Sequence, residues 1–276
     1  MRRIAHLSDL HFGSEDPVVV AALTEELNAD PPDLVAVSGD LTLGARNREF
    51  RAAAAFLGGL RAPVLAVPGN HDLTPYKLWE RFIDPFGRWH AHLGPEIEPV
   101  FADAEIAVVG LNTARRGGFY LDWSRGRIGR GGLARCEARL AALDPGLVRL
   151  VVAHHPFLPP RAVPGARMVG GAKAALAAFG RQRVRLLLSG HLHRGDVTEP
   201  VAAAGPGAAP GLTVVLSATT TSRRLRGEPN AYNSIRVWPG GKVELTVRAW
   251  DAAARRWRAV VAAEAAGGVM ASVVEA

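Results

Sequence analysis

The sequence of 276 residues is poor in cysteine, in lysine and in long apolar runs. Its single cysteine, Cys136, excludes an intramolecular disulfide and any cysteine-rich zinc or iron–sulfur site. No apolar run approaches the roughly 18 residues that a transmembrane helix needs, so no membrane span is expected. The segment Met1–Asp9 is basic but lacks the apolar stretch of a signal peptide. We therefore expect a cytoplasmic protein.

The charge is positive, with 33 Lys and Arg against 26 Asp and Glu and a net charge of +7. Lysine contributes only Lys77, Lys173 and Lys242, so the charge is almost all arginine. A basic chain attracts anionic partners such as nucleic acid or phosphorylated metabolites. The arginines are scattered, however, and no run of Lys and Arg exceeds two residues. Nucleic acid stays open as a partner but is not favoured.

Hydrophobic residues make up 48% and charged residues 21% of the chain, which excludes a disordered protein. Up to about residue 190, short apolar runs alternate with patterns of helical spacing. This alternation predicts an α/β fold in which helices cover a partly parallel sheet. The predicted strands are Ile4–Leu7, Leu34–Val37, Val64–Val67, Glu105–Leu111, Leu147–Ala153 and Val184–Leu188. The predicted helices are Val18–Leu27, Glu49–Leu60, Leu133–Leu143 and Ala172–Phe179.

After residue 195 the helical patterns give way to β-branched and aromatic runs. These runs are Leu212–Leu216, Ile235–Trp238, Val243–Trp250 and Trp257–Ala262. Gly240-Gly241 between two of them is a hairpin signal. We therefore expect a second, largely antiparallel sheet at this end of the chain. The prediction is one domain of two sheets over residues 1–265, followed by a flexible tail at 266–276.

Five polar clusters follow predicted strands directly. Since ligands bind beyond the carboxyl ends of strands in α/β sheets, the five loops are expected to converge on one point. The clusters are Asp9-Leu10-His11, Gly39-Asp40, Gly69-Asn70-His71-Asp72, His154-His155-Pro156 and Gly190-His191-Leu192-His193.

The side chains of these clusters are carboxylates, imidazoles and an amide, which suit divalent Mn, Fe, Zn or Co. In an extended chain Asp9 and His11 point the same way and can grip one ion. His191 and His193 have the same spacing and can reach two neighbouring ions. Asp40 is alone on its loop, and a lone carboxylate can bridge two metals. The glycines before Asp40, Asn70 and His191 fit close backbone approaches.

Each cluster alone also has an ordinary structural interpretation. Asp-x-His and Gly-Asp are common in solvated turns, Gly-Asn also forms turns, and His154-His155-Pro156 could be a helix stop with exposed histidines. Gly-His-Leu-His is the most specific of the five. All five together, in this order and setting, favour a metal site.

In these motifs the sequence resembles the calcineurin-like metallophosphoesterases. Their signature is Asp-x-His, Gly-Asp, Gly-Asn-His-Asp or Glu, His, and Gly-His-x-His, and every block is present between Asp9 and His193. The resemblance implies a four-layer α/β/β/α sandwich of two mixed β-sheets flanked by helices. It also implies two divalent ions, with Mn, Fe or Zn as candidates. One ion would be held by Asp9, His11 and His193 and the other by Asn70, His154 and His191, with Asp40 as the bridge.

The resemblance further implies the roles of two residues outside the ligand set. His71 would face the phosphate and protonate the leaving oxygen, and Asp72 would orient His71. A hydroxide that bridges the ions would attack phosphorus in line, without a covalent intermediate. His154 is preferred to His155 because the family places its ligand two residues before the proline.

The chain looks most like the bacterial class III cyclic nucleotide phosphodiesterases and related glycerophosphodiesterases, which implies a small phosphodiester substrate. Two loops offer further contacts, although both could equally be ordinary surface loops. The first, Asn112–Gly132, is a candidate lid and carries Arg115, Arg116, Tyr120, Trp123 and Arg127. The second, Thr219–Asn233, carries Arg223, Arg224, Arg226 and Asn230.

Alternative functions stay open at this level. They are a metal-dependent nuclease for single-stranded nucleic acid, a hydrolase of another phosphate ester or pyrophosphate, and a non-catalytic metal-binding scaffold. The scaffold is least favoured, because no motif is degraded. A homo-oligomer also stays open.

Overall fold

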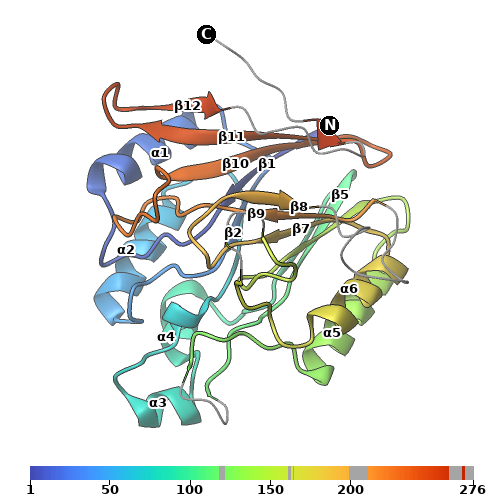
Figure 1. The fold of residues 1–276 in the computed structure, drawn as a ribbon, viewed down its shortest axis with the longest axis horizontal. Coiled ribbons are helices and arrows are strands. Elements are labelled where there is room, and N and C mark those ends of the chain that lie inside the picture. Colours follow the sequence, from blue (N-terminus) through green and yellow to red (C-terminus); the bar gives the residue numbers. More distant parts are fainter. Residues whose placement is uncertain (118–121, 161–162, 164, 199–210, 261–268, 271–276) are drawn as a thin grey trace.

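Two mixed β-sheets lie face to face, with helices on their outer sides (Figure 1). The computed structural model describes residues 1–117, 122–160, 163, 165–198, 211–260 and 269–270. The predicted four-layer α/β/β/α sandwich is confirmed. Of the tail predicted from residue 266, only Val269–Met270 is described, as strand β13. The rest of that tail lies outside the described residues.

The first sheet joins the two ends of the chain. β1, β2 and β3 are parallel to one another, while β10 pairs antiparallel with β1. Short β13 runs parallel to β11. The strand order is β12 (Arg256–Val260), β11 (Val243–Asp251), β10 (Ala231–Val237), β1 (Arg2–Leu7), β2 (Leu34–Ser38) and β3 (Val64–Val67).

The second sheet has a parallel centre with an antiparallel strand at each edge. β5, β6, β7 and β9 are parallel, and β4 and β8 are the edges. The strand order is β4 (Val100–Ala102), β5 (Ile106–Gly110), β6 (Val148–Val152), β7 (Val184–Ser189), β9 (Thr213–Leu216) and β8 (Asp196–Thr198).

The expectation that the C-terminal strands form a sheet of their own is wrong. β9 joins the second sheet beside β7, whereas β10, β11 and β12 extend the first sheet from β1. The predicted hairpin is present, because Gly240 and Gly241 both adopt positive φ between β10 and β11. A local pattern identifies a strand, but the partner of that strand depends on contacts distant in sequence.

Successive side chains of each central strand point to opposite faces of its sheet, and this alternation explains the layers. In β2, Leu34 and Ala36 pack between the sheets, whereas Val35 and Val37 pack against the outer helices. The strands of the second sheet alternate in the same way. Because both faces of the central strands are covered, most of their residues are apolar, as in β2 and β5. The helices are α1 (Pro17–Ala29) and α2 (Asn47–Gly58) on the first sheet, and α5 (Arg130–Ala142) and α6 (Ala172–Arg181) on the second.

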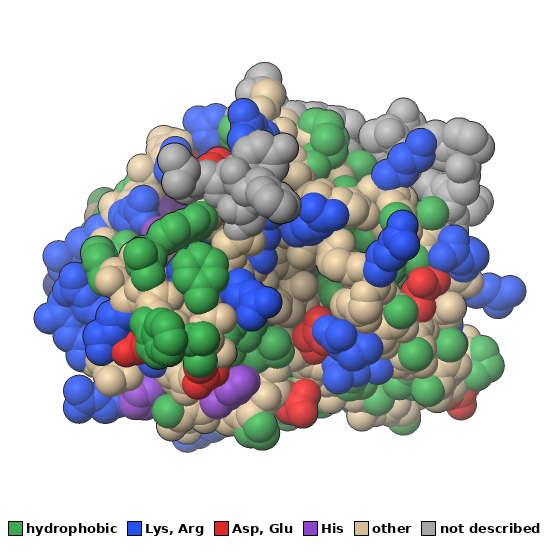
Figure 2. All heavy atoms as spheres, turned by 90° about the horizontal axis from the view of Figure 1, so that it is seen from below, with side chains coloured by type: hydrophobic (Ala, Val, Ile, Leu, Met, Phe, Trp, Pro, Cys, Tyr) green, Lys and Arg blue, Asp and Glu red, His purple; other side chains and the backbone are tan. Residues whose placement is uncertain are grey.

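Two short helices follow the third polar cluster and were not predicted. They are α3 (Leu78–Ile83) and α4 (Gly87–Leu93). The segment around α3 leaves Tyr76, Leu78, Trp79, Phe82 and Ile83 exposed. In Figure 2, hydrophobic side chains gather on the left of the face seen from below, the side on which α3 lies in Figure 1. Within the described residues no helix has the length and apolar character to cross a membrane.

Candidate metal centre

The structure brings the five polar clusters together. β1, β2 and β3 deliver Asp9, Asp40 and Asn70 from the first sheet, and β6 and β7 deliver His154 and His191 from the second. Backbone hydrogen bonds tie these loops directly to one another. The Asp9 amide donates to the Gly39 carbonyl at 3.1 Å, and the Gly190 amide donates to the His154 carbonyl at 2.9 Å.

The first half of the site contains Asp9, His11 and His193. The Nε2 atoms of His11 and His193 lie 3.0 Å apart. Asp9 Oδ1 is 3.6 Å from the first of these nitrogens and 3.3 Å from the second. Each ring places its Nδ1 near a backbone carbonyl, that of Thr42 at 3.3 Å and that of Arg224 at 3.0 Å. With Nδ1 as the donor to a carbonyl, Nε2 carries a lone pair suited to a metal.

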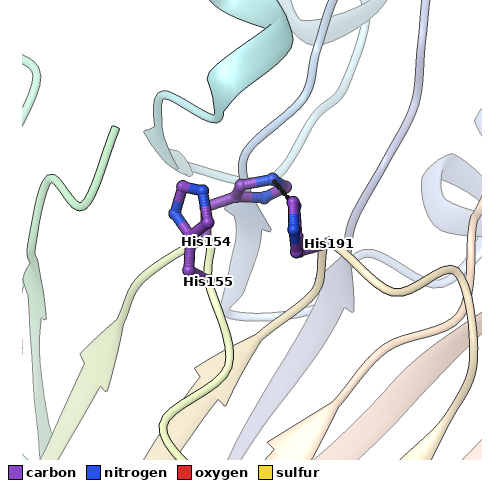
Figure 3. A group of neighbouring side chains, drawn as sticks. All are labelled: His154, His155 and His191. Atoms are coloured by element: carbon purple, nitrogen blue, oxygen red, sulfur yellow. Dashed lines mark hydrogen bonds between the residues drawn. The ribbon is translucent and has the colours of Figure 1, made fainter. Parts of the chain in front are cut away.

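The second half contains Asn70, His154 and His191. His154 Nε2 lies 3.2 Å from Asn70 Oδ1 and 3.2 Å from His191 Nδ1 (Figure 3). The other ring nitrogen of His154 is 2.7 Å from the Ser38 carbonyl and is the donor to it. A nitrogen, an amide oxygen and a second nitrogen therefore face one another, which is again a set of metal-ligand atoms.

Asp40 lies between the two halves. Its Oδ2 is 3.3 Å from His154 Nε2 and 3.8 Å from His11 Nε2, while its Oδ1 accepts a hydrogen bond from the His71 amide at 2.9 Å. Burial alone would raise the pKa of Asp40, but the surrounding imidazoles, His154 first, outweigh burial and hold the pKa well below its usual range. The carboxylate between the halves is therefore ionised, as a bridging ligand must be.

The donor set fits two divalent cations. Asp9 Oδ1 is buried and has no hydrogen-bond partner, although the other oxygen of this carboxylate accepts from Ser8 Oγ and the His191 amide. An orphaned carboxylate oxygen beside two imidazole lone pairs is unfavourable unless a cation joins them. Overlapping groups of His and Asp with ligand atoms within 4.8 Å of one another recur through the cluster.

The ligand loops use unusual backbone conformations. Positive φ occurs at Asp9 (51°), His11 (49°), Asp40 (52°), His191 (77°) and His193 (59°). Such values are uncommon for residues with a side chain and concentrate at functional sites. The prediction that Asp9 and His11 converge is supported, but the reason given for it, an extended chain, is wrong.

Two glycines allow these loops to approach closely. A Cβ at Gly69 would lie 2.1 Å from Asp40 Oδ1, and a Cβ at Gly190 would lie 1.7 Å from Ser8 Oγ. Neither position has room for a side chain. The expectation that glycines in these motifs permit close approach is confirmed.

His71 and Asp72 are not connected as predicted. His71 Nδ1 lies 2.6 Å from the Leu43 carbonyl, and its ring packs edge-on against His11. The Asp72 carboxylate accepts instead from the amides of Gly69 and Thr42, at 2.9 and 2.8 Å. Asp72 therefore joins the loops after β2 and β3, and the Leu43 carbonyl orients His71. Burial and the Asp40 charge raise the pKa of Asp72 to about 6.

The geometry favours His154 over His155 as the ligand. His155 Nδ1 lies 2.8 Å from Thr113 Oγ1 and its Nε2 lies 2.9 Å from the Ser124 carbonyl. Both ring nitrogens are therefore engaged, although Figure 3 shows this ring beside His154. His155 instead fixes the segment at Ser124 over the site.

A buried row of hydroxyls supports the first ligand loop. Thr219 Oγ1 donates to the Asp9 carbonyl at 2.7 Å, and Thr221 Oγ1 donates to the Leu10 carbonyl at 2.8 Å. The Ser8 amide donates to Thr220 Oγ1 at 3.0 Å. This role was not predicted, although three consecutive threonines follow closely after a predicted strand. Asn230, in the same loop, donates to the Ser222 carbonyl at 2.9 Å.

Two adjoining cavities open at the cluster. The smaller, of about 530 Å³, is lined by Asp40, Asn70, His71, His191 and His193 together with Arg194, Arg224 and Arg226. The larger, of about 1170 Å³, shares Ser124, His191 and Leu192 with it. Of the arginines predicted in the Thr219–Asn233 loop, Arg224 and Arg226 line the smaller cavity and Arg223 does not.

The candidate lid is only partly supported. Arg115 and Arg127 line the larger cavity, but Trp123 packs over the buried guanidinium of Arg81 at 4.8 Å and lines neither cavity. Arg116 is exposed and donates to the Phe82 carbonyl at 3.2 Å. Tyr120 lies outside the described residues.

Residues 2–195 match the model of the calcineurin-like phosphoesterase family. The chain belongs to this family. The matched segment ends just after His193 and so contains all five motifs.

Several curated relatives are phosphodiesterases by name. The chain is 27% identical over 212 residues to the 3′,5′-cyclic adenosine monophosphate phosphodiesterase CpdA of Escherichia coli, covering 70% of each chain. It is 25% identical to a probable cyclic nucleotide phosphodiesterase of Synechococcus, covering 86% of this chain and 88% of that protein. It is 39% identical over 80 residues to the glycerophosphodiester phosphodiesterase GpdQ of Enterobacter lignolyticus, and this match covers only 29% of that relative.

Solved structures support the fold. A dimetal phosphatase from Danio rerio aligns with a TM-score of 0.64 at 13% identity, covering 89% of this chain and 95% of that one. A purple acid phosphatase from yellow lupin gives the same TM-score and identity, covering 90% of this chain and 51% of that one.

Proposed function

We propose that this protein is a dinuclear metal-dependent phosphodiesterase that hydrolyses small phosphodiesters of the cyclic nucleotide type. One observation carries the proposal: the donor atoms of seven candidate ligands from five loops face one another, with Asp40 between the two halves. The names of the relatives support a diester substrate. Mn, Fe and Zn are the candidate ions, because the ligands mix imidazole with oxygen donors.

The protein's own residues divide into those that would bind the metal ions and those that would act on the substrate. Asp9, His11 and His193 would hold one ion and Asn70, His154 and His191 the other, with Asp40 shared between them. Two bound divalent ions supply Lewis-acid chemistry, lowering the pKa of water and neutralising charge on phosphoryl oxygens.

His71 is the proposed general acid. It lines the smaller cavity, and its Nδ1 is engaged by the Leu43 carbonyl. Nε2 is therefore the ring nitrogen free to deliver a proton to the leaving oxygen. Arg224 and Arg226 line the same cavity and are placed to attract the phosphodiester anion.

A substrate panel tests the proposal. It compares bis-p-nitrophenyl phosphate, cyclic AMP, a glycerophosphodiester, a phosphate monoester and a single-stranded oligonucleotide, each at two salt concentrations. We expect kcat/KM to be higher for small diesters than for the monoester or the oligonucleotide. No turnover of any diester by the metal-loaded protein would contradict the proposal.

A nuclease for single-stranded nucleic acid is the second candidate, and the net charge of +7 favours it. Electrostatic attraction to a long polyanion weakens steeply with salt, whereas the fit of a small diester does not. If the oligonucleotide is the better substrate at both salt concentrations, the nuclease function replaces the proposed hydrolysis of small diesters.

A further inference from the structure

The larger cavity lies beside the metal centre but takes no part in the chemistry described above. It meets the smaller cavity at Ser124, His191 and Leu192, so a ligand held at the candidate ions can extend directly into it. Its volume of about 1170 Å³ far exceeds the space that a small ester group needs, and lies somewhat above the roughly 300–1,000 Å³ that is typical of ligand pockets.

The floor of this cavity is apolar. Phe157, Leu158, Val169 and Leu176 line it, and all four are buried members of the core beneath the second sheet. Such a floor accommodates a flat or apolar group and gives a phosphate no partner. Any ligand group that lies against this floor should therefore be uncharged.

The sides of the cavity are strongly basic. Arg115, Arg125, Arg127, Arg167 and Lys173 line it, against one carboxylate, Asp122. Arg125 donates to that carboxylate at 3.0 Å. Arg127, Arg167 and Lys173 are exposed and form no ion pair among the described residues. These three cations around an apolar floor can pair with an anionic group on a ligand.

The wall that carries Arg127 is held in place before any ligand arrives. Segments 126–128 and 169–171 pair through a parallel bridge between Arg127 and Gly170. The Ile128 amide donates to the Gly170 carbonyl at 2.8 Å, and the Gly170 amide donates to the Gly126 carbonyl at 3.0 Å. A preorganised wall lowers the entropic cost of binding.

We propose that the larger cavity binds a substrate arm that carries a second phosphate. The preferred substrates would then be phosphodiesters in which a flat or apolar group, such as a nucleoside, separates the scissile phosphate from a terminal phosphate. Arg127 and Lys173 contact that terminal phosphate. This inference rests on the proposed function for the cleavage of the scissile phosphate. It adds that, among small diesters, those with a second phosphate are preferred.

The test uses two chromogenic substrates that differ only in the distal phosphate. They are thymidine 5′-(p-nitrophenyl phosphate) and the same compound with a 3′-phosphate. We expect kcat/KM to be about tenfold or more higher for the 3′-phosphorylated compound, mainly through KM, as one charge-assisted hydrogen bond provides. The double variant Arg127→Gln/Lys173→Gln should bring the ratio close to one.

A matched control removes the same charge elsewhere. Arg48→Gln/Arg258→Gln also loses two positive charges, at exposed positions that line neither cavity. It should keep the wild-type ratio. A ratio near one in the wild type, or a ratio retained in Arg127→Gln/Lys173→Gln, would overturn the proposal. Thermal unfolding of both variants confirms that they fold.

A binding measurement separates this proposal from the proposed function. Calorimetry should show that thymidine 3′,5′-bisphosphate binds the wild type about tenfold or more tighter than thymidine 5′-phosphate. The preference should disappear in Arg127→Gln/Lys173→Gln. If the metal-loaded enzyme cleaves no diester but this preference is seen, the phosphodiesterase assignment fails and the phosphate site stands. Equal binding of the two nucleotides would overturn the phosphate site.

Discussion

The Nε2 atoms of His11 and His193 face each other at 3.0 Å, although the two residues are 182 positions apart in the chain. Each ring has its Nδ1 beside a backbone carbonyl, so both Nε2 atoms present lone pairs. Two lone pairs at this distance repel each other unless a proton or a metal ion lies between them. The protein thus holds in place an arrangement that a cation stabilises.

Removing the His71 imidazole should separate proton transfer from metal binding. His71→Ala should retain its metals and lose turnover by a factor on the order of 10²–10⁴, the usual contribution of a general acid. The loss should shrink for p-nitrophenyl esters, whose leaving group needs no proton. Metal analysis and kcat on two leaving groups test this, with exposed His90→Ala as control.

The opposite outcome is specific. His71, His11 and Asp40 each place a possible ligand atom within 4.8 Å of the other two, so His71 could also contact an ion. If metal content falls together with activity in His71→Ala, His71 is a ligand and its assignment as the acid is wrong.

Acid should destabilise the metal-free protein partly through His6. Burial lowers the pKa of His6 to about 3, and its ring is held by Ser38 and Asn233. The unfolded state binds this proton near pH 6.5 and the folded state near pH 3, so stability falls as the pH drops between these values. The wild type should lose about 1.4 kcal/mol per pH unit more than His6→Gln in this window.

Urea unfolding of the metal-free protein at several pH values between 6.5 and 4 measures how steeply the free energy of unfolding depends on pH. Every other residue is the same in both proteins, so the difference between the two slopes isolates His6. His90→Gln is the control and should keep the wild-type slope. Equal slopes for the wild type and His6→Gln would show that His6 is not held neutral.

A methyl group at Gly190 should damage the site without removing a ligand. The new Cβ would overlap Ser8 Oγ, which itself donates to Asp9 Oδ2 at 2.6 Å. We expect Gly190→Ala to lower the free energy of unfolding by about 2 kcal/mol or more and to weaken metal binding. Gly58→Ala is the control, because nothing lies within 4 Å of its Cβ, and it should be neutral or slightly stabilising. Unchanged metal affinity in Gly190→Ala would contradict the close packing at this loop.

The central strands and the convergence of the candidate ligands could be predicted because both leave a local pattern. β3 was placed at its observed limits, since apolar runs bounded by turn residues identify buried strands. Candidate ligands could be named because imidazoles and carboxylates gather directly after strands. The family resemblance then assigned each one to an ion.

What escaped prediction depends on contacts distant in sequence. The link between Asp72 and the loops after β2 and β3 involves backbone amides, which no motif displays. The partner of β9 is set by β7 and not by the β-rich sequence that follows it. α3 is only six residues long, which is too short for helical periodicity to be recognised, and its apolar residues Leu78, Trp79, Phe82 and Ile83 are exposed instead of packed in the core. The larger cavity combines segments from three parts of the chain.

The metal content of the wild type and Asp40→Ala tests the central claim most directly. Protein refilled with excess Mn²⁺ and freed of unbound ions should hold two ions per chain, as a shared carboxylate between two half-sites requires. Asp40→Ala should lose both ions together, whereas Asp144→Ala, which removes an exposed carboxylate, should keep both. A wild type that saturates at one ion, or an Asp40→Ala variant that still holds one tightly, would contradict a dinuclear centre bridged by Asp40.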